Sequence, residues 1–228
     1  WKAMLKPLMG KASARYFVPK VFEGKPEPEG DRPLRILFLT QLWNDREPGF
    51  SDEENAERTY INQMRIDIIR ALRERYGDSF IGGLNDNALS RSWAPDLIMP
   101  AEYTERKRYL NLVHSCDICI GSMGLFESIG GKTGEYVAAA KAIVNERLHY
   151  TVTGDFSEGV HYLSFETVEE CLTAVQKLVD DSGLRIAMKR ANAEYYRNFL
   201  RPDMLVKNTL ELVDRAVEAE QKKDFIKA

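Results

Sequence analysis

A glycine-rich stretch in the middle of the chain, residues 121–135, carries residue types that bind phosphate and sugar groups. It follows a short apolar run and opens a helical pattern, so it predicts a strand end, a tight turn and a helix start. The first backbone N–H groups of such a helix and its positive dipole end attract anions. Lys132 adds a cation there, and Glu135, one helical turn further on, can accept hydrogen bonds from the vicinal hydroxyls of a ribose. These residues therefore predict a nucleotide site.

Three other patterns suggest different chemistry, and their surroundings argue against each of them. The run Gly-Lys-Thr at 131–133 resembles the end of a P-loop, but the glycine required five residues earlier is replaced by Phe126. Cys116 and Cys119 have redox spacing, yet they lie in an apolar strand pattern rather than at a helix start, so we expect them to fill the core. A zinc site is not predicted, because the histidines do not show metal-ligand spacing: His114, His149 and His161.

Strand-like and helical patterns alternate along the chain, which predicts an α/β fold: a Rossmann-like parallel sheet covered by helices, with further helices at the C-terminus. The expected strands cover residues 34–40, 80–82, 117–121, 142–145 and 160–164. The expected helices cover residues 52–76, 104–115, 130–141, 167–181, 183–199 and 202–220, with a capping box at Thr167 and Glu170. Ligands of an open parallel sheet bind beyond the carboxyl ends of its strands, where we expect residues 121–135 to lie.

Composition limits the class of protein. The chain has 228 residues, of which 44% are hydrophobic and 29% charged, as in globular proteins. No apolar run approaches the roughly 18 residues of a membrane span. The net charge of −3 creates no overall field that would attract nucleic acid. Three cysteines are too few for a disulfide framework and favour a reducing, cytoplasmic compartment.

The N-terminal part of the chain differs from the rest. Residues 1–25 contain six basic residues and one acidic residue among apolar ones, and residues 24–33 contain three prolines and two glycines. We therefore expect residues 1–33 to form a basic amphipathic leader and linker, and residues 34–228 to form one domain. The leader is expected to contact a membrane surface or to pack on the rest of the molecule, and we favour the second option.

The two glutamates of the glycine-rich stretch, Glu127 and Glu135, are separated by seven residues. Together with its continuation through residue 144, this span resembles the E-x7-E signature of retaining GT-B glycosyltransferases (glycosyl transferases group 1). In that family the signature lies in the C-terminal, Rossmann-like domain, which holds the donor nucleotide-sugar. The resemblance extends from residue 34 to the C-terminus, and it implies transfer of a sugar to a polysaccharide or glycolipid acceptor.

The resemblance also implies a role for individual residues. Glu127 would contact the hydroxyls of the transferred sugar as the catalytic residue, Lys132 would contact the diphosphate, and Glu135 would contact the ribose. Arg65 is a further candidate for a cation that contacts phosphate. The remaining candidates for donor binding are Gly124, Ser128, Gly130, Gly131 and Thr133.

Absent motifs and the size of the chain shape the remaining expectations. No Asp lies two positions from another Asp, so the metal-chelating Asp-x-Asp pattern is missing and we expect a reaction without metal or cofactor. Because one Rossmann-like domain forms only one wall of a transfer site, the chain alone should bind a nucleoside diphosphate but transfer little sugar.

The expected partners are a nucleotide-sugar donor, a saccharide or glycolipid acceptor, and an N-terminal acceptor domain or partner chain. Nucleic acid is not among them, and a peripheral contact with the inner face of the membrane is a further option. Two alternatives stay open for the function. One is a non-catalytic nucleotide or nucleotide-sugar binding module that acts as a partner or regulatory domain. The other is an epimerase-like enzyme of the same architecture.

Overall fold

The computed structural model describes residues 19–26 and 30–227, with side chains described as far as residue 219. The described residues form one five-stranded parallel sheet with strand order β2-β1-β3-β4-β5. The strands are β1 (Ile36–Thr40), β2 (Phe80–Leu84), β3 (Ile118–Gly121), β4 (Ala142–Glu146) and β5 (Leu163–Phe165). The predicted Rossmann-like α/β fold is therefore confirmed, with strand bounds that differ from the expected ones by a few residues.

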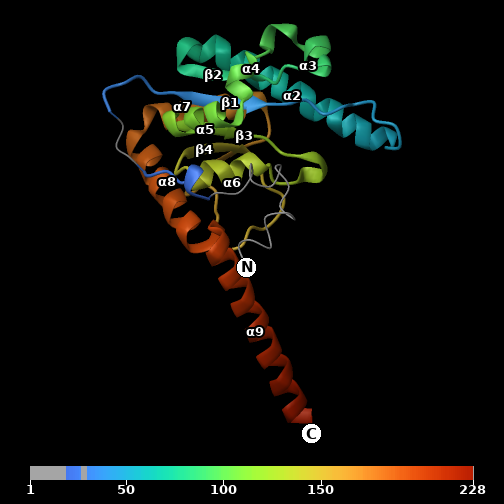
Figure 1. The fold of residues 1–228 in the computed structure, drawn as a ribbon, viewed down its shortest axis with the longest axis vertical. Coiled ribbons are helices and arrows are strands. Elements are labelled where there is room, and N and C mark those ends of the chain that lie inside the picture. Colours follow the sequence, from blue (N-terminus) through green and yellow to red (C-terminus); the bar gives the residue numbers. More distant parts are fainter. Residues whose placement is uncertain (1–18, 27–29, 228) are drawn as a thin grey trace, which may run out of the picture.

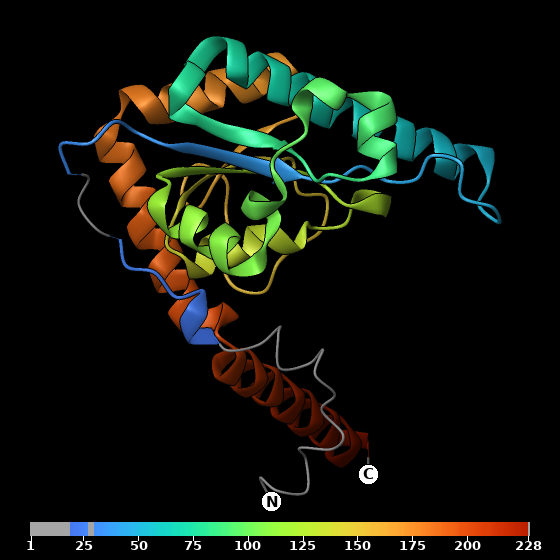
Figure 2. The same ribbon diagram turned by 45° about the horizontal axis from the view of Figure 1, so that its top comes forward.

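Helices cover both faces of the sheet, as Figures 1 and 2 show. They are α2 (Asp52–Tyr76), α3 (Ala88–Trp93), α4 (Ala101–Thr104), α5 (Arg106–Ser115), α6 (Gly131–Ala138), α7 (Val168–Asp180), α8 (Ser182–Tyr195) and α9 (Pro202–Lys227). Successive side chains of a strand point to opposite faces. Ile36 and Phe38 of β1 therefore pack in the cluster that contains α2 and α7, whereas Leu37 and Leu39 pack in the cluster that contains α5 and α6.

Side-chain caps determine where two of the helices begin. At the start of α2, the Ser51 side chain accepts the Glu54 N–H at 3.2 Å and the Glu54 carboxylate accepts the Ser51 N–H at 2.7 Å. At the start of α7, the Thr167 hydroxyl accepts the Glu170 N–H, as predicted. The Glu170 carboxylate, however, accepts the N–H of Glu166 rather than that of Thr167, so the capping box expected there forms only in part.

Several expected helices differ in extent from the observed ones. Residues 88–93 form α3, which the sequence pattern did not predict, and the expected helix 104–115 corresponds to α5 preceded by the short helix α4. Helix α6 ends at Ala138 rather than near Lys141, because Ala140 adopts a left-handed conformation with φ of +54° that turns the chain toward β4. After α8, residues Tyr196–Leu200 form a π-helix that leads into α9.

Helix α9 extends away from the body of the molecule and begins at Pro202, as predicted (Figure 1). Its described side chains are mostly exposed, and six large apolar ones are among them: Leu205, Val206, Leu210, Leu212, Val213 and Val217. No helix in the described part of the chain is both long enough and apolar enough to cross a membrane. The described residues therefore leave an apolar face of α9 open to solvent.

The N-terminal leader is described only in part, because residues 1–18 and 27–29 lie outside the described ranges. The described residues 19–26 contact the body of the domain: the Gly24 N–H donates to the Ala138 carbonyl at 2.9 Å, and the Tyr196 hydroxyl donates to Glu23 at 3.2 Å. A Cβ atom on Gly24 would lie 2.2 Å from the Ala139 carbonyl oxygen, so this approach of two backbone segments requires glycine.

The cysteines lie in the core. Cys116, Cys119 and Cys171 are all buried and free, which confirms that the redox-like pair at 116 and 119 fills the core. Burial raises the pKa of the Cys116 thiol to about 11, so the reactive thiolate is scarce at neutral pH. In the part of the chain that the structure describes, no three His, Cys, Asp or Glu residues gather closely enough to hold a metal ion.

Candidate nucleotide site

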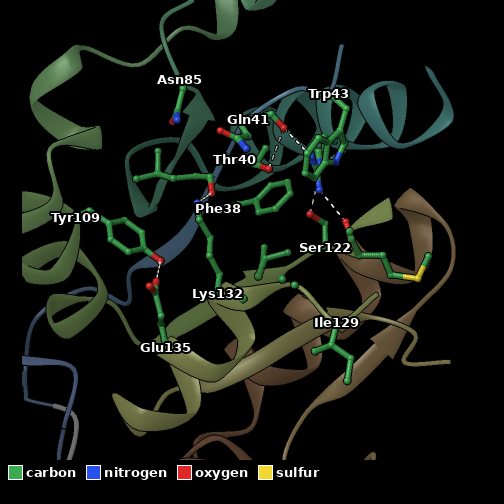
Figure 3. Close-up of a pocket in the computed structure, with 18 of the residues that line it drawn as sticks. Phe38, Thr40, Gln41, Trp43, Asn85, Tyr109, Ser122, Ile129, Lys132 and Glu135 are labelled. Carbon is green, nitrogen blue, oxygen red and sulfur yellow. Dashed lines mark hydrogen bonds between the residues drawn. The ribbon is translucent and has the colours of Figure 1, made fainter. Parts of the chain in front are cut away.

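A cavity of about 710 Å³ opens at the carboxyl ends of β1 and β3 (Figure 3). From β1 the chain first adds β2 on one side and later places β3 on the other, so the order of strands reverses between β1 and β3. Such a reversal leaves a crevice where open α/β sheets bind their ligands. Residues from the end of β1, the loop after β3 and the first turn of α6 line the cavity, as predicted for residues 121–135.

Glycines shape the loop between β3 and α6 in two different ways. A Cβ atom on Gly121 would lie 1.9 Å from the Asn145 side-chain oxygen, and one on Gly130 would lie 2.5 Å from the Ser122 carbonyl oxygen. These two glycines therefore allow backbone and neighbouring groups to pack closely. Gly131 has no such neighbour within 4 Å, so its backbone faces open space in the cavity.

The first turn of α6 presents free backbone donors to the cavity. The Thr133 N–H donates to the Gly130 carbonyl at 2.9 Å. The N–H groups of Gly131 and Lys132 have no hydrogen-bond acceptor among the described residues. Because both residues line the cavity, these donors are available to an anion there.

Lys132 extends across the cavity from α6 toward β1 (Figure 3). Its ammonium donates to the Leu39 carbonyl and lies 5.1 Å from the centre of the Tyr109 ring. Burial lowers the pKa of Lys132 to about 8, while the nearby Glu135 carboxylate acts in the opposite direction. Most Lys132 side chains are therefore charged at pH 7, and an anion bound beside them would raise this pKa.

Glu135 and Tyr109 form a pair on one side of Lys132 (Figure 3). The Tyr109 hydroxyl donates to Oε2 of Glu135 at 2.8 Å, and no hydrogen bond from a described residue reaches Oε1. Burial raises the pKa of Tyr109, so the phenol keeps its proton and remains a donor. One oxygen of a fixed carboxylate is thus free to accept a hydrogen bond from a ligand hydroxyl.

Arg65, which lines the cavity from α2, joins the loops that follow β1 and β3. Its guanidinium donates to the Gln41 carbonyl at 2.6 Å, to the Ser122 hydroxyl at 3.1 Å and to the Met123 carbonyl at 2.7 Å. Burial lowers the pKa of Arg65 to about 10, which leaves the side chain charged at neutral pH. Each of its three nitrogens contacts the protein, so Arg65 braces the cavity wall.

The other predicted site residues lie in three places. Gly124, Ser128, Gly130 and Gly131 line the cavity together with Lys132, Glu135 and Arg65. Thr133 does not line it: the side chain is buried, and its hydroxyl donates to the Asn145 side chain at 2.8 Å. Glu127 lies just before Ser128 with an exposed carboxylate, whose Oε2 is 3.5 Å from Nδ1 of His149. Glu127 does not itself line the cavity but precedes the lining residue Ser128, and we call this position the rim of the cavity.

Two of the residues near the cavity that were not predicted make polar contacts with its lining: Tyr109 and Glu146. Tyr109 belongs to the apolar face of α5, where its spacing from Leu110 and Val113 is typical of a core position. Glu146 ends β4 with 3% of its surface exposed and accepts the Met123 N–H at 2.8 Å. Burial raises the pKa of Glu146. The one available signal was a carboxylate two positions after the apolar run 142–144.

Comparisons with known proteins support the fold. No protein-family model and no curated protein matches the chain. Among solved structures, it resembles the C-terminal domain of a glycosyl transferase group 1 family protein from Francisella tularensis, with 9% identity and a TM-score of 0.53. The match covers 82% of this chain and 99% of that domain. This chain therefore has the Rossmann-like fold of that domain.

Two further matches are to longer proteins and have lower TM-scores. A UDP-N-acetylglucosamine 2-epimerase from Listeria monocytogenes matches with 15% identity and a TM-score of 0.46 over 76% of this chain. A sucrose-phosphate synthase from Thermosynechococcus elongatus matches with 13% identity and a TM-score of 0.44 over 89% of this chain. The chain spans about half the length of these two proteins, 45% and 51% respectively.

Proposed function

We propose that this chain is the donor-binding half of a GT-B glycosyltransferase and holds a nucleoside diphosphate sugar in the cavity between β1 and β3. The groups that Glu135, Lys132 and the start of α6 present to the cavity carry this proposal. Glu135, positioned by Tyr109, would accept hydrogen bonds from ribose hydroxyls. Lys132 and the open N–H groups of α6 come next and would bind the diphosphate. Glu127 at the rim would contact the transferred sugar. Bound in this way, the ribose, diphosphate and sugar would follow one another as they do in the donor.

The same groups suggest how the transfer would proceed. When the bond between the sugar and the diphosphate breaks, negative charge develops on the leaving diphosphate. A diphosphate bound against the first turn of α6 would lie next to Lys132 and the positive end of the helix dipole, and both would stabilise that charge. We expect these groups to act in place of a metal ion.

The acceptor would come from outside this domain. Sugar transfer requires donor and acceptor to be held together in a closed site. The exposed apolar face of α9 offers a surface on which an acceptor domain or partner chain could pack. We propose a polysaccharide or glycolipid acceptor. A chain extended by an acceptor domain should transfer sugar much faster than this chain alone, and rapid transfer by this chain alone would contradict the half-enzyme proposal.

A second candidate is a nucleotide or nucleotide-sugar binding module that does not catalyse transfer. The position of Glu127 favours this candidate: the carboxylate does not line the cavity and pairs with His149 instead. The two candidates differ in whether Glu127 contacts the transferred sugar.

Glu127→Gln should distinguish between them. If Glu127 contacts the sugar, the variant should bind a nucleoside diphosphate as wild type does but lose the extra affinity that the attached sugar provides, because an amide is a weaker acceptor than a carboxylate. Titration calorimetry with UDP, GDP and ADP and with their glucose conjugates measures both affinities. Glu169→Gln, an exposed change on α7, serves as the control. An unchanged sugar contribution in Glu127→Gln would support the binding module.

Nucleoside diphosphate binding should also depend on pH through Lys132. Without a ligand, the Lys132 side chain has a pKa of about 8. A bound diphosphate would raise this pKa, because it binds the protonated side chain more tightly than the neutral one. Affinity should therefore be retained below pH 8 and should fall about tenfold between pH 7 and pH 9. Calorimetry at these pH values measures the change. Lys132→Arg stays charged over this range and should flatten the profile. A pH-independent wild-type affinity would argue against contact between Lys132 and the ligand.

A further inference from the structure

The loop that carries Glu127 has an unusual backbone. Phe126 has φ of +57° and ψ of +39°, and Glu127 has φ of +56°, so two consecutive non-glycine residues are left-handed. This conformation is unfavourable for residues with a Cβ atom, and surrounding contacts must hold it in place. The Phe126 side chain gains no burial in return, because 56% of its surface is exposed.

Side chains from two other segments hold both backbone polar groups of Phe126. On one side, the Phe126 N–H donates to Oε1 of Glu57 in α2 at 2.6 Å. On the other side, the Tyr150 hydroxyl, from the loop after β4, donates to the Phe126 carbonyl at 3.0 Å. Residue 149 of that same loop contacts the Glu127 carboxylate, as described above. The turn is closed locally, because the Ser128 N–H donates to the Leu125 carbonyl at 3.1 Å, and residues distant in the sequence hold it from both sides.

We propose that Glu57 and Tyr150 are positioning residues: they clamp the peptide backbone at Phe126 and thereby place the Glu127 carboxylate at the rim of the cavity. This inference rests on the proposed function, in which Glu127 contacts the transferred sugar. Without the clamp, water would satisfy the two backbone groups. Residues 126 and 127 would keep the turn bond between the Ser128 N–H and the Leu125 carbonyl but would adopt right-handed or extended conformations more often. The Glu127 carboxylate would then leave the rim, while the groups that bind ribose and diphosphate, Glu135 and Lys132, would stay in place.

The two replacements of Glu57 separate its acceptor role from its other properties. Glu57→Gln keeps a side-chain oxygen that can accept the Phe126 N–H, whereas Glu57→Ala removes it. Glu74→Ala, an exposed change near the other end of α2, is the matched control. Tyr150→Phe removes only the hydroxyl that donates to the Phe126 carbonyl.

Amide hydrogen exchange tests the clamp without any ligand. The Phe126 N–H should exchange at least about tenfold faster in Glu57→Ala than in wild type, because its acceptor is gone. It should exchange at nearly the wild-type rate in Glu57→Gln and in the Glu74→Ala control. Equal exchange rates in wild type and Glu57→Ala would overturn the clamp.

Ligand binding tests the positioning role, with UDP, GDP and ADP and their glucose conjugates as probes. Glu57→Ala and Tyr150→Phe should keep the affinity for the nucleoside diphosphate but lose most of the extra affinity that the sugar provides, and Glu57→Gln should retain most of it. Faster exchange with an unchanged sugar contribution would overturn the positioning role. If wild type binds none of the probes, the proposed function fails together with this role, and the exchange rates still decide whether the clamp exists.

Discussion

Replacement of Glu135 with alanine should weaken nucleoside diphosphate binding about 10- to 150-fold. The variant loses a charged acceptor for the ribose hydroxyls, and hydrogen bonds to charged groups contribute about 1.5–3 kcal/mol, which corresponds to this range of affinities. It also leaves the Tyr109 hydroxyl, which donates to Glu135 in the wild-type protein, without that acceptor. Titration calorimetry with the tightest-binding nucleoside diphosphate measures the change.

Two controls define what Glu135 contributes. Glu135→Gln keeps an acceptor oxygen but removes the charge, so its effect should be smaller than that of the alanine variant. Tyr109→Phe frees the carboxylate from its protein donor and tests whether Tyr109 is needed to orient it. If the folded Glu135→Ala variant binds the nucleoside diphosphate as tightly as wild type does, Glu135 does not belong to the nucleotide site.

Asp117→Asn should lower the free energy of unfolding by about 3 kcal/mol. Asp117 begins the turn into β3 with 3% of its surface exposed. Its carboxylate accepts hydrogen bonds from Arg32 at 2.8 and 3.0 Å, from the Arg35 N–H at 3.0 Å and from the buried Lys189 at 3.2 Å. Breaking a buried ion pair costs about 3–5 kcal/mol. We expect a loss at the lower end of this range, because the Arg32 side chain is 44% exposed and water can solvate it once its partner is gone.

The pH dependence of this effect has a definite sign. Burial by itself would raise the pKa of Asp117, but Arg32, the Arg35 N–H and Lys189 together hold it below its ordinary value of 3.8. The stabilisation is therefore present above that value and is lost as the pH falls through the lowered pKa. Urea unfolding at pH 7 and pH 3 should show a larger difference between wild type and Asp117→Asn at pH 7 than at pH 3.

Asp96→Asn, which removes an exposed ion pair with Arg70, provides the comparison and should change the urea midpoint far less. An Asp117→Asn protein as stable as wild type at pH 7 would show that the buried cluster does not hold the leader segment and α8 to the sheet.

Local sequence patterns sufficed for the parallel sheet but not for every helix boundary. The apolar runs at 36–39 and 142–144 lie in buried strands because helices cover both faces of the sheet. Helix α3 escaped prediction because its sequence, Ala-Leu-Ser-Arg-Ser-Trp, is short and shows no helical period. The end of α6 escaped it because Ala138 and Ala139 favour a helix, and only the tertiary turn at Ala140 stops it.

The candidate site, too, could be predicted only where its residues lie close together in the sequence. Gly131, Lys132 and Glu135 belong to one loop and helix, so their convergence on one cavity followed from local spacing. The contact of Glu135 with Tyr109 and the clamp on Phe126 join segments far apart in the chain, and a single sequence carries no signal for such pairs. The bracing role of Arg65 likewise depends on two loops that only the folded sheet brings together.

Calorimetric titration of the 228-residue chain with UDP, GDP and ADP in metal-free buffer tests the central claim most directly. We expect one site that binds at least one of these nucleotides, with the affinity weakened about tenfold or more in both Lys132→Ala and Glu135→Ala. The clamp variant Glu57→Ala should bind the same nucleotide as wild type does. A folded wild-type chain that binds none of the three, or that binds one equally well without Lys132 and Glu135, would contradict a nucleotide site between β1 and β3.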